Sequence, residues 1–317
     1  MTALNADSIR WLENRFKNSI RFEEPMSRHT SLRIGGPAEI FASPETLEDL
    51  YALINWSREK GLSYLVIGRG TNLLVKDTGI RGIVVKLTKC LNTIEQIEAD
   101  TEGVLVTAMA GANLAALCAY TLKRGLKGMN FSLGIPGTIG GGVIMNAGTS
   151  YGSMENVLVS IDVLPPGGQP LRIRKEALDF AYRKLSWNPK LTDGPGKQTI
   201  ILNGRFSFCP SDPEKLKKSA REIMKARRRK QPMGFPSAGC FFKNPPSGPT
   251  AGELIEMCGL KGKSVGGAEI SSKHANFFIN RRNASAADFL ALMDITEDTV
   301  SKKFNIHLER EVKVVGT

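Results

Sequence analysis

The chain has 317 residues, a formal net charge of +12 and a pI of about 9.5. Its composition, with 41% hydrophobic and 23% charged residues, is typical of a globular protein and excludes a disordered chain. No apolar run reaches the roughly 18–20 residues of a membrane span, and the N-terminus lacks the apolar stretch of a signal peptide. We therefore expect a cytoplasmic protein of two or three compact units, without membrane contact, whose charge favours anionic partners.

Cysteine and histidine usage argues against a metal or a disulfide framework. The five cysteines are widely spaced and contain no CxxC pair, and none of the three histidines is spaced with a second ligand. The scarcity of histidine also shifts any acid–base chemistry toward Cys, Glu, Arg, Lys or Tyr.

Helices and strands alternate through the first two thirds of the chain. A helix over 44–60 is predicted, with Ser43 as its cap and Pro44 at its first position, and Gly61 ends it. A second helix over 113–124 follows the cap Asn113. Short segments rich in β-branched residues predict strands at 64–67, 82–87, 104–110, 157–164 and 199–208.

The last third begins with a strongly basic helix. Asp212 and Pro213 mark its start, and residues 215–230 hold nine Lys or Arg. Thr250 and Glu253 form a capping-box pattern for a short helix. A last helix at about 285–303 and a strand at 311–315 complete the chain, and the whole pattern predicts an α+β fold.

Two glycine-rich segments stand out, Gly68–Val75 (GRGTNLLV) and Gly134–Gly142 (GIPGTIGGG), the second running on to Gly148. Glycine-rich turns expose backbone N–H groups that can hold a pyrophosphate. Neither segment matches the Rossmann or the Walker pattern. From spacing alone, phosphate binding and plain tight turns stay equally open, because glycine mostly punctuates turns.

Six motifs together resemble one family. They are similar to the FAD-binding domain of the vanillyl-alcohol-oxidase (PCMH) type, and in particular to the MurB family of UDP-N-acetylenolpyruvoylglucosamine reductases. The matching segments, in the family's order, are Arg33–Ala38 (RIGGPA), Gly68–Leu74, Ser132–Gly142, Phe180–Ser186 (FAYRKLS), Ser237–Pro245 (SAGCFFKNP) and Leu308–Gly316 (LEREVKVVG).

The resemblance implies two FAD-binding subdomains, at 1–92 and 93–208, and a smaller α+β substrate-binding domain at 209–317. It also implies non-covalent FAD, since neither glycine segment holds a histidine or cysteine that could tether the ring. The residues that would contact FAD by this resemblance are Gly68, Gly70, Thr71, Asn72, Leu73, Ile135, Pro136, Thr138, Gly140, Gly141 and Gly148.

Three residues correspond to the family's catalytic positions. The resemblance implies that Arg183 binds the substrate carboxylate, that Cys240 donates a proton where many members have serine, and that Glu311 donates from the other side. Taken singly, each has a plainer interpretation: a surface cation, a small buried thiol and a charge at a strand edge.

The same resemblance implies NADPH as hydride donor and a UDP-sugar as substrate. Lys230, Asn244 and, with weaker support, Lys243 would contact the substrate's diphosphate or uridine. The chain has no tyrosine between Tyr182 and its end, so it resembles the type that lacks a substrate-closing tyrosine loop. We expect a monomer that does not bind nucleic acid.

Two other functions stay open at this stage. A flavoenzyme of the same fold could oxidise an alcohol or a hydroxy acid, although the Ser237–Pro245 segment argues against it. A basic protein that binds nucleic acid or an anionic surface is the other, although no recognition motif or aromatic interleaving supports it.

Overall fold

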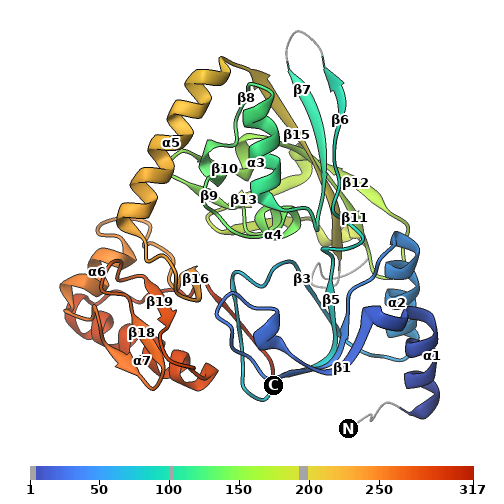
Figure 1. The fold of residues 1–317 in the computed structure, drawn as a ribbon, viewed down its shortest axis with the longest axis horizontal. Helices are drawn as coiled ribbons and strands as arrows, with labels where there is room; N and C mark the ends of the chain where they lie inside the picture. The colour runs from blue at the N-terminus through green and yellow to red at the C-terminus, as the bar shows by residue number, and fades with distance from the viewer. Residues whose placement is uncertain (1–4, 100–102, 193–198) are drawn as a thin grey trace. The chain divides into compact units, whose positions relative to one another are not determined.

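The structure is a computed structural model, and it describes residues 5–99, 103–192 and 199–317. Figure 1 shows the mixture of helices and sheets that confirms the predicted α+β fold. The helices are α1 (Ala6–Phe16), α2 (Leu47–Glu59), α3 (Leu114–Lys123), α4 (Ile139–Ile144), α5 (Pro213–Lys230), α6 (Ala251–Met257) and α7 (Ala286–Phe304). The strands are β1 (Ile20–Pro25), β2 (Pro37–Ala42), β3 (Tyr64–Ile67), β4 (Leu73–Val75), β5 (Ile80–Lys86), β6 (Ile94–Ala99), β7 (Val104–Met109), β8 (Leu126–Lys127), β9 (Gly148–Thr149), β10 (Gly152–Ser153), β11 (Leu158–Leu164), β12 (Leu171–Arg174), β13 (Leu178–Ala181), β14 (Lys184–Trp187), β15 (Ile200–Pro210), β16 (Ser237–Cys240), β17 (Ser264–Val265), β18 (Ala268–Ile270), β19 (Phe277–Asn280) and β20 (Lys313–Val315).

The chain divides into two compact units, and each is built from separate stretches of sequence. The N-terminal unit comprises the residues up to Glu24, Ala38–Gly68 and Arg81–Ala220. The C-terminal unit comprises Pro25–Pro37, Arg69–Ile80 and Arg221–Thr317. The predicted boundaries at residues 92 and 208 stay a prediction.

The N-terminal unit contains two larger sheets around one hydrophobic core, together with the two-stranded pairs β9-β10 and β13-β14. The first has the order β1-β2-β5-β3, with β3 and β5 parallel. The second has the order β12-β11-β15-β7-β6 and is antiparallel. Along β7 and β15, buried residues such as Val106 and Phe206 alternate with more exposed ones, as a half-buried sheet requires. Leu117 of α3 and Val143 of α4 belong to the same core, so both helices help to cover this sheet.

The C-terminal unit has a core of its own. Its sheet has the order β16-β19-β18-β17, and residues of α6 and α7 complete the core. Three buried aromatic rings lie at its centre: Phe241 stacks on Phe278, with ring centroids 4.5 Å apart, and on Phe289, at 5.6 Å. Such pairs add a favourable contact beyond the area that they bury.

A parallel pair of strands explains why the C-terminal unit includes residues 69–80 from the first third of the sequence. Strand β4 pairs with β20, with Leu73 opposite Lys313. Nearby, the carboxylate of Asp77 accepts hydrogen bonds from the N–H groups of Ala286 and Ala287, at 2.8 and 3.0 Å. These are the first residues of α7, whose unsatisfied N–H groups favour a negative charge.

Most predicted elements are confirmed within a few residues. Asp212 accepts hydrogen bonds from the N–H groups of Glu214 and Lys215 at the start of α5, and Thr250 and Glu253 form the predicted capping box. The last strand is shorter than predicted and covers only 313–315. None of the described helices is long and apolar enough to cross a membrane.

One predicted cap is wrong. Helix α2 begins at Leu47, and the hydroxyl of Thr46, not that of Ser43, accepts a hydrogen bond from Asp49 N at 3.1 Å. Glu48 and Asp49 lie in the first turn, where negative charge interacts favourably with the helix dipole.

We expect Thr46→Ala to lower the free energy of unfolding by about 1 kcal/mol, because it leaves an N–H group of α2 without its partner. Ser43→Ala is the matched control and should change it by less than about 0.5 kcal/mol. Urea unfolding followed by tryptophan fluorescence measures both, since Trp56 lies in α2. Equal effects of the two substitutions would contradict this assignment of the cap.

Candidate active site

Gly68, the first residue of the first glycine-rich segment, contacts the second segment inside the N-terminal unit. A Cβ atom added to Gly68 would lie 2.2 Å from the hydroxyl of Thr138, which is far too close for any side chain. Thr138 is the cap of α4, and its hydroxyl accepts a hydrogen bond from Gly141 N at 3.4 Å. The structure therefore brings together segments that lie about 70 residues apart in the sequence.

The second glycine segment leaves part of its backbone open. Gly134, Pro136 and Gly141 are exposed. A Cβ atom added to Gly141 would have only the Thr138 hydroxyl within 4 Å, at 3.5 Å. A flat ring or a phosphate can approach such a surface closely, because no side chain covers the main chain. These residues therefore fit a nucleotide cofactor such as FAD.

The rest of the first glycine segment belongs to the C-terminal unit. Gly70 has a φ of 61°, and a Cβ atom there would lie 2.1 Å from the carbonyl oxygen of His29. The side chain of Asn72 donates a hydrogen bond to the carbonyl of Glu311 at 3.1 Å, and its own carbonyl accepts one from Lys313 N at 3.0 Å. The segment predicted to bind FAD is thus hydrogen-bonded both to Glu311 and to Lys313, the first residue of β20.

Arg183 lies at the tip of the hairpin formed by β13 and β14. Its φ of 59° is unusual for a residue with a side chain. The guanidinium donates a hydrogen bond to the carbonyl of Gly148 at 3.0 Å and lies 4.9 Å from the ring centroid of Tyr182. Asn146, which is buried, supports the hairpin by donating to the carbonyl of Ala181 at 3.2 Å.

Cys240 and Glu311 come from segments that pair with each other. Glu311 N donates a hydrogen bond to the carbonyl of Phe241 at 2.8 Å, and Phe242 forms an isolated antiparallel bridge with Arg310. Both Cys240 and Glu311 are partly buried. Burial lowers the pKa of Arg227, and the charge of the nearby Cys240 opposes this shift.

The predicted substrate residues also lie in the C-terminal unit. Lys230 is exposed and ends α5, and Lys243 forms an ion pair with Glu309. The side-chain oxygen of Asn244 accepts a hydrogen bond from Ala251 N at 3.2 Å, at the start of α6. Glu253 reaches back to Thr250, whose hydrogen bonds lower the pKa of its carboxyl, so its capping role is confirmed.

His274 lies near two cationic side chains of this region. Burial lowers the pKa of His274 below its usual 6.5, and the positive charges of Lys261 and Lys230 lower it further. A backbone hydrogen bond and Glu256 act in the opposite direction. The imidazole is therefore neutral near pH 7, and its Nδ1 accepts a hydrogen bond from Asn276 N at 3.2 Å.

Within each unit, the structure brings several predicted site residues together. In the N-terminal unit, Gly68 contacts Thr138, and Arg183 contacts Gly148. In the C-terminal unit, Asn72, Cys240 and Glu311 lie on connected segments. Their roles in binding and catalysis stay predictions. Among the described residues, no three His, Cys, Asp or Glu side chains are grouped so that they could hold a metal ion.

The sequence did not predict that two buried asparagines support these residues. Asn146 holds the Arg183 hairpin, and Asn276 holds the segment after Cys240. Their positions beside the glycine segment and in a short polar turn were the available signals, but neither pattern shows which backbone groups an amide contacts.

Two parts of the chain match known domain families. Residues 38–174 match the model of an FAD binding domain, and residues 231–315 match that of the C-terminal domain of UDP-N-acetylenolpyruvoylglucosamine reductase. The chain is therefore an FAD-dependent oxidoreductase with a second, more specific domain. Both matches agree with the resemblance found in the sequence.

The relatives identify the family. A UDP-N-acetylenolpyruvoylglucosamine reductase from Desulfosudis oleivorans is 44% identical over 306 residues, which are 96% of this chain and 97% of the relative. One from Heliobacterium modesticaldum is 40% identical, over 95% of this chain and 92% of the relative. The crystal structure of the enzyme (MurB) from Thermus caldophilus is 33% identical, covers 94% of this chain and 98% of its own, and has a TM-score of 0.74. This chain belongs to the UDP-N-acetylenolpyruvoylglucosamine reductase family.

The left-handed backbone conformation of Arg183 should lower the stability of the protein. A left-handed conformation costs roughly 1–2 kcal/mol for any residue that has a Cβ atom. We therefore expect Arg183→Gly to be more stable than Arg183→Ala by about 1 kcal/mol, although both lose the guanidinium. Thermal unfolding of the two variants side by side measures the difference, and a more stable alanine variant would contradict the conformation.

The lowered pKa of His274 should make the stability of the protein depend on pH. Because its pKa is lower in the folded protein, the unfolded chain binds the proton more tightly below about pH 6.5. The free energy of unfolding should therefore fall as the pH drops from 7.5 to 5.5, and His274→Gln should flatten that slope while keeping an acceptor for Asn276 N. Urea titrations at both pH values test this, with His307→Gln as the control at an exposed histidine. Equal slopes in the parent and in His274→Gln would refute it.

Proposed function

We propose that this chain reduces UDP-N-acetylglucosamine-enolpyruvate to UDP-N-acetylmuramate, with FAD as its cofactor and NADPH as the hydride donor. This reaction belongs to peptidoglycan precursor synthesis. The observation that carries the proposal is the identity of 44% over 96% of the chain to a reductase of that name. The pairing of the Cys240 and Glu311 segments supports it further.

The residues proposed to hold FAD come from both glycine segments. The exposed glycines of the second segment suit a non-covalent cofactor, because a flat ring or a phosphate can approach a main chain that no side chain covers. We propose as contacts Gly68, Gly70, Thr71, Asn72, Leu73, Ile135, Pro136, Thr138, Gly140, Gly141 and Gly148. FAD bound there would supply the hydride-transfer chemistry between NADPH and the terminal alkene carbon of the substrate.

Arg183 is the proposed partner of the substrate carboxylate. As hydride adds, negative charge develops on the neighbouring carbon and on this carboxylate, so a fixed cation there lowers the barrier. A guanidinium is suitable because it stays charged and its two N–H groups can hold both carboxylate oxygens. The bonds to Gly148 and the support from Asn146 orient the hairpin that carries it.

Cys240 is the proposed proton donor, and Glu311 assists at the carboxylate. A thiol, with a reference pKa of about 8.5, gives up a proton far more readily than a serine hydroxyl. After protonating the substrate carbon, the thiolate must recover a proton from solvent. Glu311 can donate a hydrogen bond to the substrate if it is protonated, which burial beside a ligand carboxylate favours.

We propose that Lys230, Asn244 and, less directly, Lys243 contact the diphosphate or uridine of the substrate. The exposed ammonium of Lys230 is the simplest anion partner of the three. Lys243 already pairs with Glu309, so it would have to exchange one anion for another. We further propose that the protein acts as a monomer.

The test of this function is NADPH consumption by the purified protein, followed by absorbance with and without UDP-N-acetylglucosamine-enolpyruvate. Rapid consumption that requires the sugar supports the proposal. A protein that contains FAD but oxidises an alcohol or a hydroxy acid, and ignores the sugar, would overturn it and leave the fold unchanged.

We expect Cys240→Ala to separate the two half-reactions. Flavin reduction by NADPH should stay within about twofold of the parent, whereas reoxidation by the UDP-sugar should fall roughly 10²–10⁴-fold, the usual effect of losing a positioned acid. Stopped-flow absorbance measures both rates, and Cys209→Ala is the control because Cys209 is exposed. Reoxidation at the parent rate would show that Cys240 is not the acid.

A further inference from the structure

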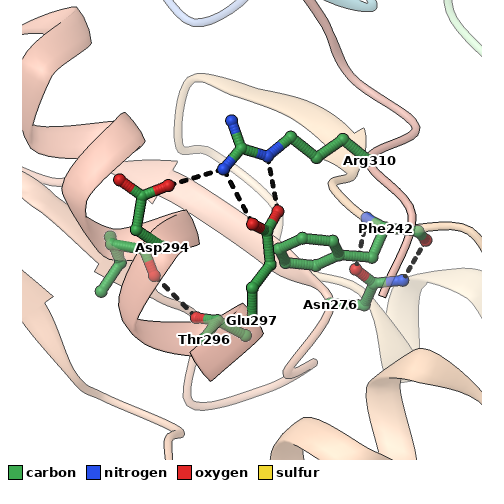
Figure 2. Close-up of polar contacts among 7 residues, drawn as sticks. Phe242, Asn276, Asp294, Thr296, Glu297 and Arg310 are labelled. Atoms are coloured by element: carbon green, nitrogen blue, oxygen red, sulfur yellow. Dashed lines mark hydrogen bonds and ion pairs between the residues drawn. The ribbon is translucent and has the colours of Figure 1, made fainter. Parts of the chain in front are cut away.

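Asn276 lies at the centre of the contacts that hold the segment after Cys240. Its side chain is 98% buried, since only 2% of the residue is exposed. The amide oxygen accepts hydrogen bonds from Phe241 N at 3.2 Å and from Phe242 N at 2.9 Å, and the amide nitrogen donates to the carbonyl of Phe242 at 2.8 Å. Figure 2 shows the amide facing the main chain of Phe242.

The amide of Asn276 binds the main chain just beyond the point where strand pairing ends. Strand β16 pairs with β19 only up to Cys240, which lies opposite Phe277, and the pairing is irregular between Ser237 and Cys240. Beyond Cys240, the main chain is bonded by Asn276, through its side chain and through its carbonyl, which accepts from Phe241 N at 3.0 Å. The N–H group of Asn276 donates a hydrogen bond to Nδ1 of His274, which holds the turn that contains Asn276.

The opposite side of the same segment contacts residues 310–311, which precede β20. Glu311 N donates to the carbonyl of Phe241, and Phe242 bridges to Arg310. Arg310 is fixed to α7 by both oxygens of Glu297, at 2.5 and 2.9 Å, and by Asp294 at 2.6 Å (Figure 2). Phe241 and Phe242 therefore lie between a buried amide and a segment that Arg310 anchors to α7.

The chemistry of this position requires an amide. An aspartate would lose the donor to the Phe242 carbonyl, and an apolar residue would remove the side-chain partner of both the N–H group and the carbonyl of Phe242. Each buried group left unpaired costs roughly 1–3 kcal/mol, and the segment would move to reduce that cost. Cys240 is the residue directly before this segment, so any such movement changes the position of its thiol relative to Glu311.

We infer that Asn276 is a positioning residue for proton delivery, which holds the main chain after Cys240 against the segment that carries Glu311. This inference rests on the proposed function, because it assigns to Asn276 the alignment of the proposed proton donor. Asn276 itself touches neither the substrate nor FAD in this role. A displacement of about 1 Å at a catalytic group can reduce a rate by about 100-fold.

The experiment compares Asn276→Asp with Asn280→Asp. Asn280, at the end of β19, also donates to a carbonyl, that of Leu32 at 3.0 Å, and accepts from an N–H group, that of Ala284 at 2.9 Å. It is the matched control, because its bonds do not touch residues 240–242. The full chain with bound FAD is used, and a Cys209→Ser background removes the exposed thiol.

Three quantities are measured for each variant. In Asn276→Asp, the limiting rate of flavin reoxidation by the UDP-sugar should fall about 10–100-fold. The sugar concentration for half-maximal rate and the rate of flavin reduction by NADPH should each change less than about threefold. Alkylation of Cys240 by iodoacetamide should change by more than about threefold, and Asn280→Asp should leave all three readings at the parent level. Three other thiols could also react with iodoacetamide. Burial raises the pKa of Cys90, Cys118 and Cys258, so fewer of these thiols are ionised and they add little to the measured alkylation.

Each outcome decides the question. If both asparagine variants behave alike, or if Asn276→Asp lowers flavin reduction as much as reoxidation, the positioning role is overturned. If the parent does not consume NADPH with the sugar, the proposed function fails, and the alkylation rates alone still test whether Asn276 positions Cys240. If Asn276→Asp does not fold, the smaller Asn276→Ser, compared with Asn280→Ser, is expected to show the same pattern, and unchanged readings would overturn the inference.

Discussion

The parallel pairing of β4 with β20 is the constraint on which the C-terminal unit depends. It joins residues 73–75 to residues 313–315, so one glycine segment and the chain's last strand form a single element. Through Asn72 and the Phe241 carbonyl, Glu311 is then held on two sides. Because the paired segments lie about 240 residues apart, their contact carries a large loop-closure entropy that the two hydrophobic cores must offset.

Buried amides, rather than surface charges, orient the residues of the candidate site. Asn146 supports the hairpin of Arg183, and Asn276 supports the segment after Cys240. An amide is well suited to both places because it donates and accepts without the desolvation cost of a charge. Much of the chain's positive charge lies on exposed side chains of residues 215–230, such as Lys230, where it favours anionic partners but does not fix geometry.

The glycines and the strained residue of the site act in opposite ways. Gly68 allows two chain segments to touch, and Gly141 leaves its main chain open to a ligand. Arg183, in contrast, keeps a side chain where the backbone would favour glycine. Strain of this kind persists only where the surrounding contacts maintain it, and here the bond to Gly148 is one of them. The left-handed backbone at Arg183 lowers stability, so the proposed function needs this residue for its guanidinium alone.

The sequence by itself determined the class of fold, most helix and strand positions, the caps at Asp212 and Thr250, and the family, because these depend on local patterns and on motifs in a fixed order. It placed the α2 cap at Ser43 instead of Thr46, since both residues suit the pattern and only the backbone path distinguishes them. The roles of Asn146 and Asn276, and the attachment of Asn72 to Glu311, were decided by the tertiary structure alone. A hydrogen bond between residues distant in sequence leaves no periodicity or spacing that a single chain reveals.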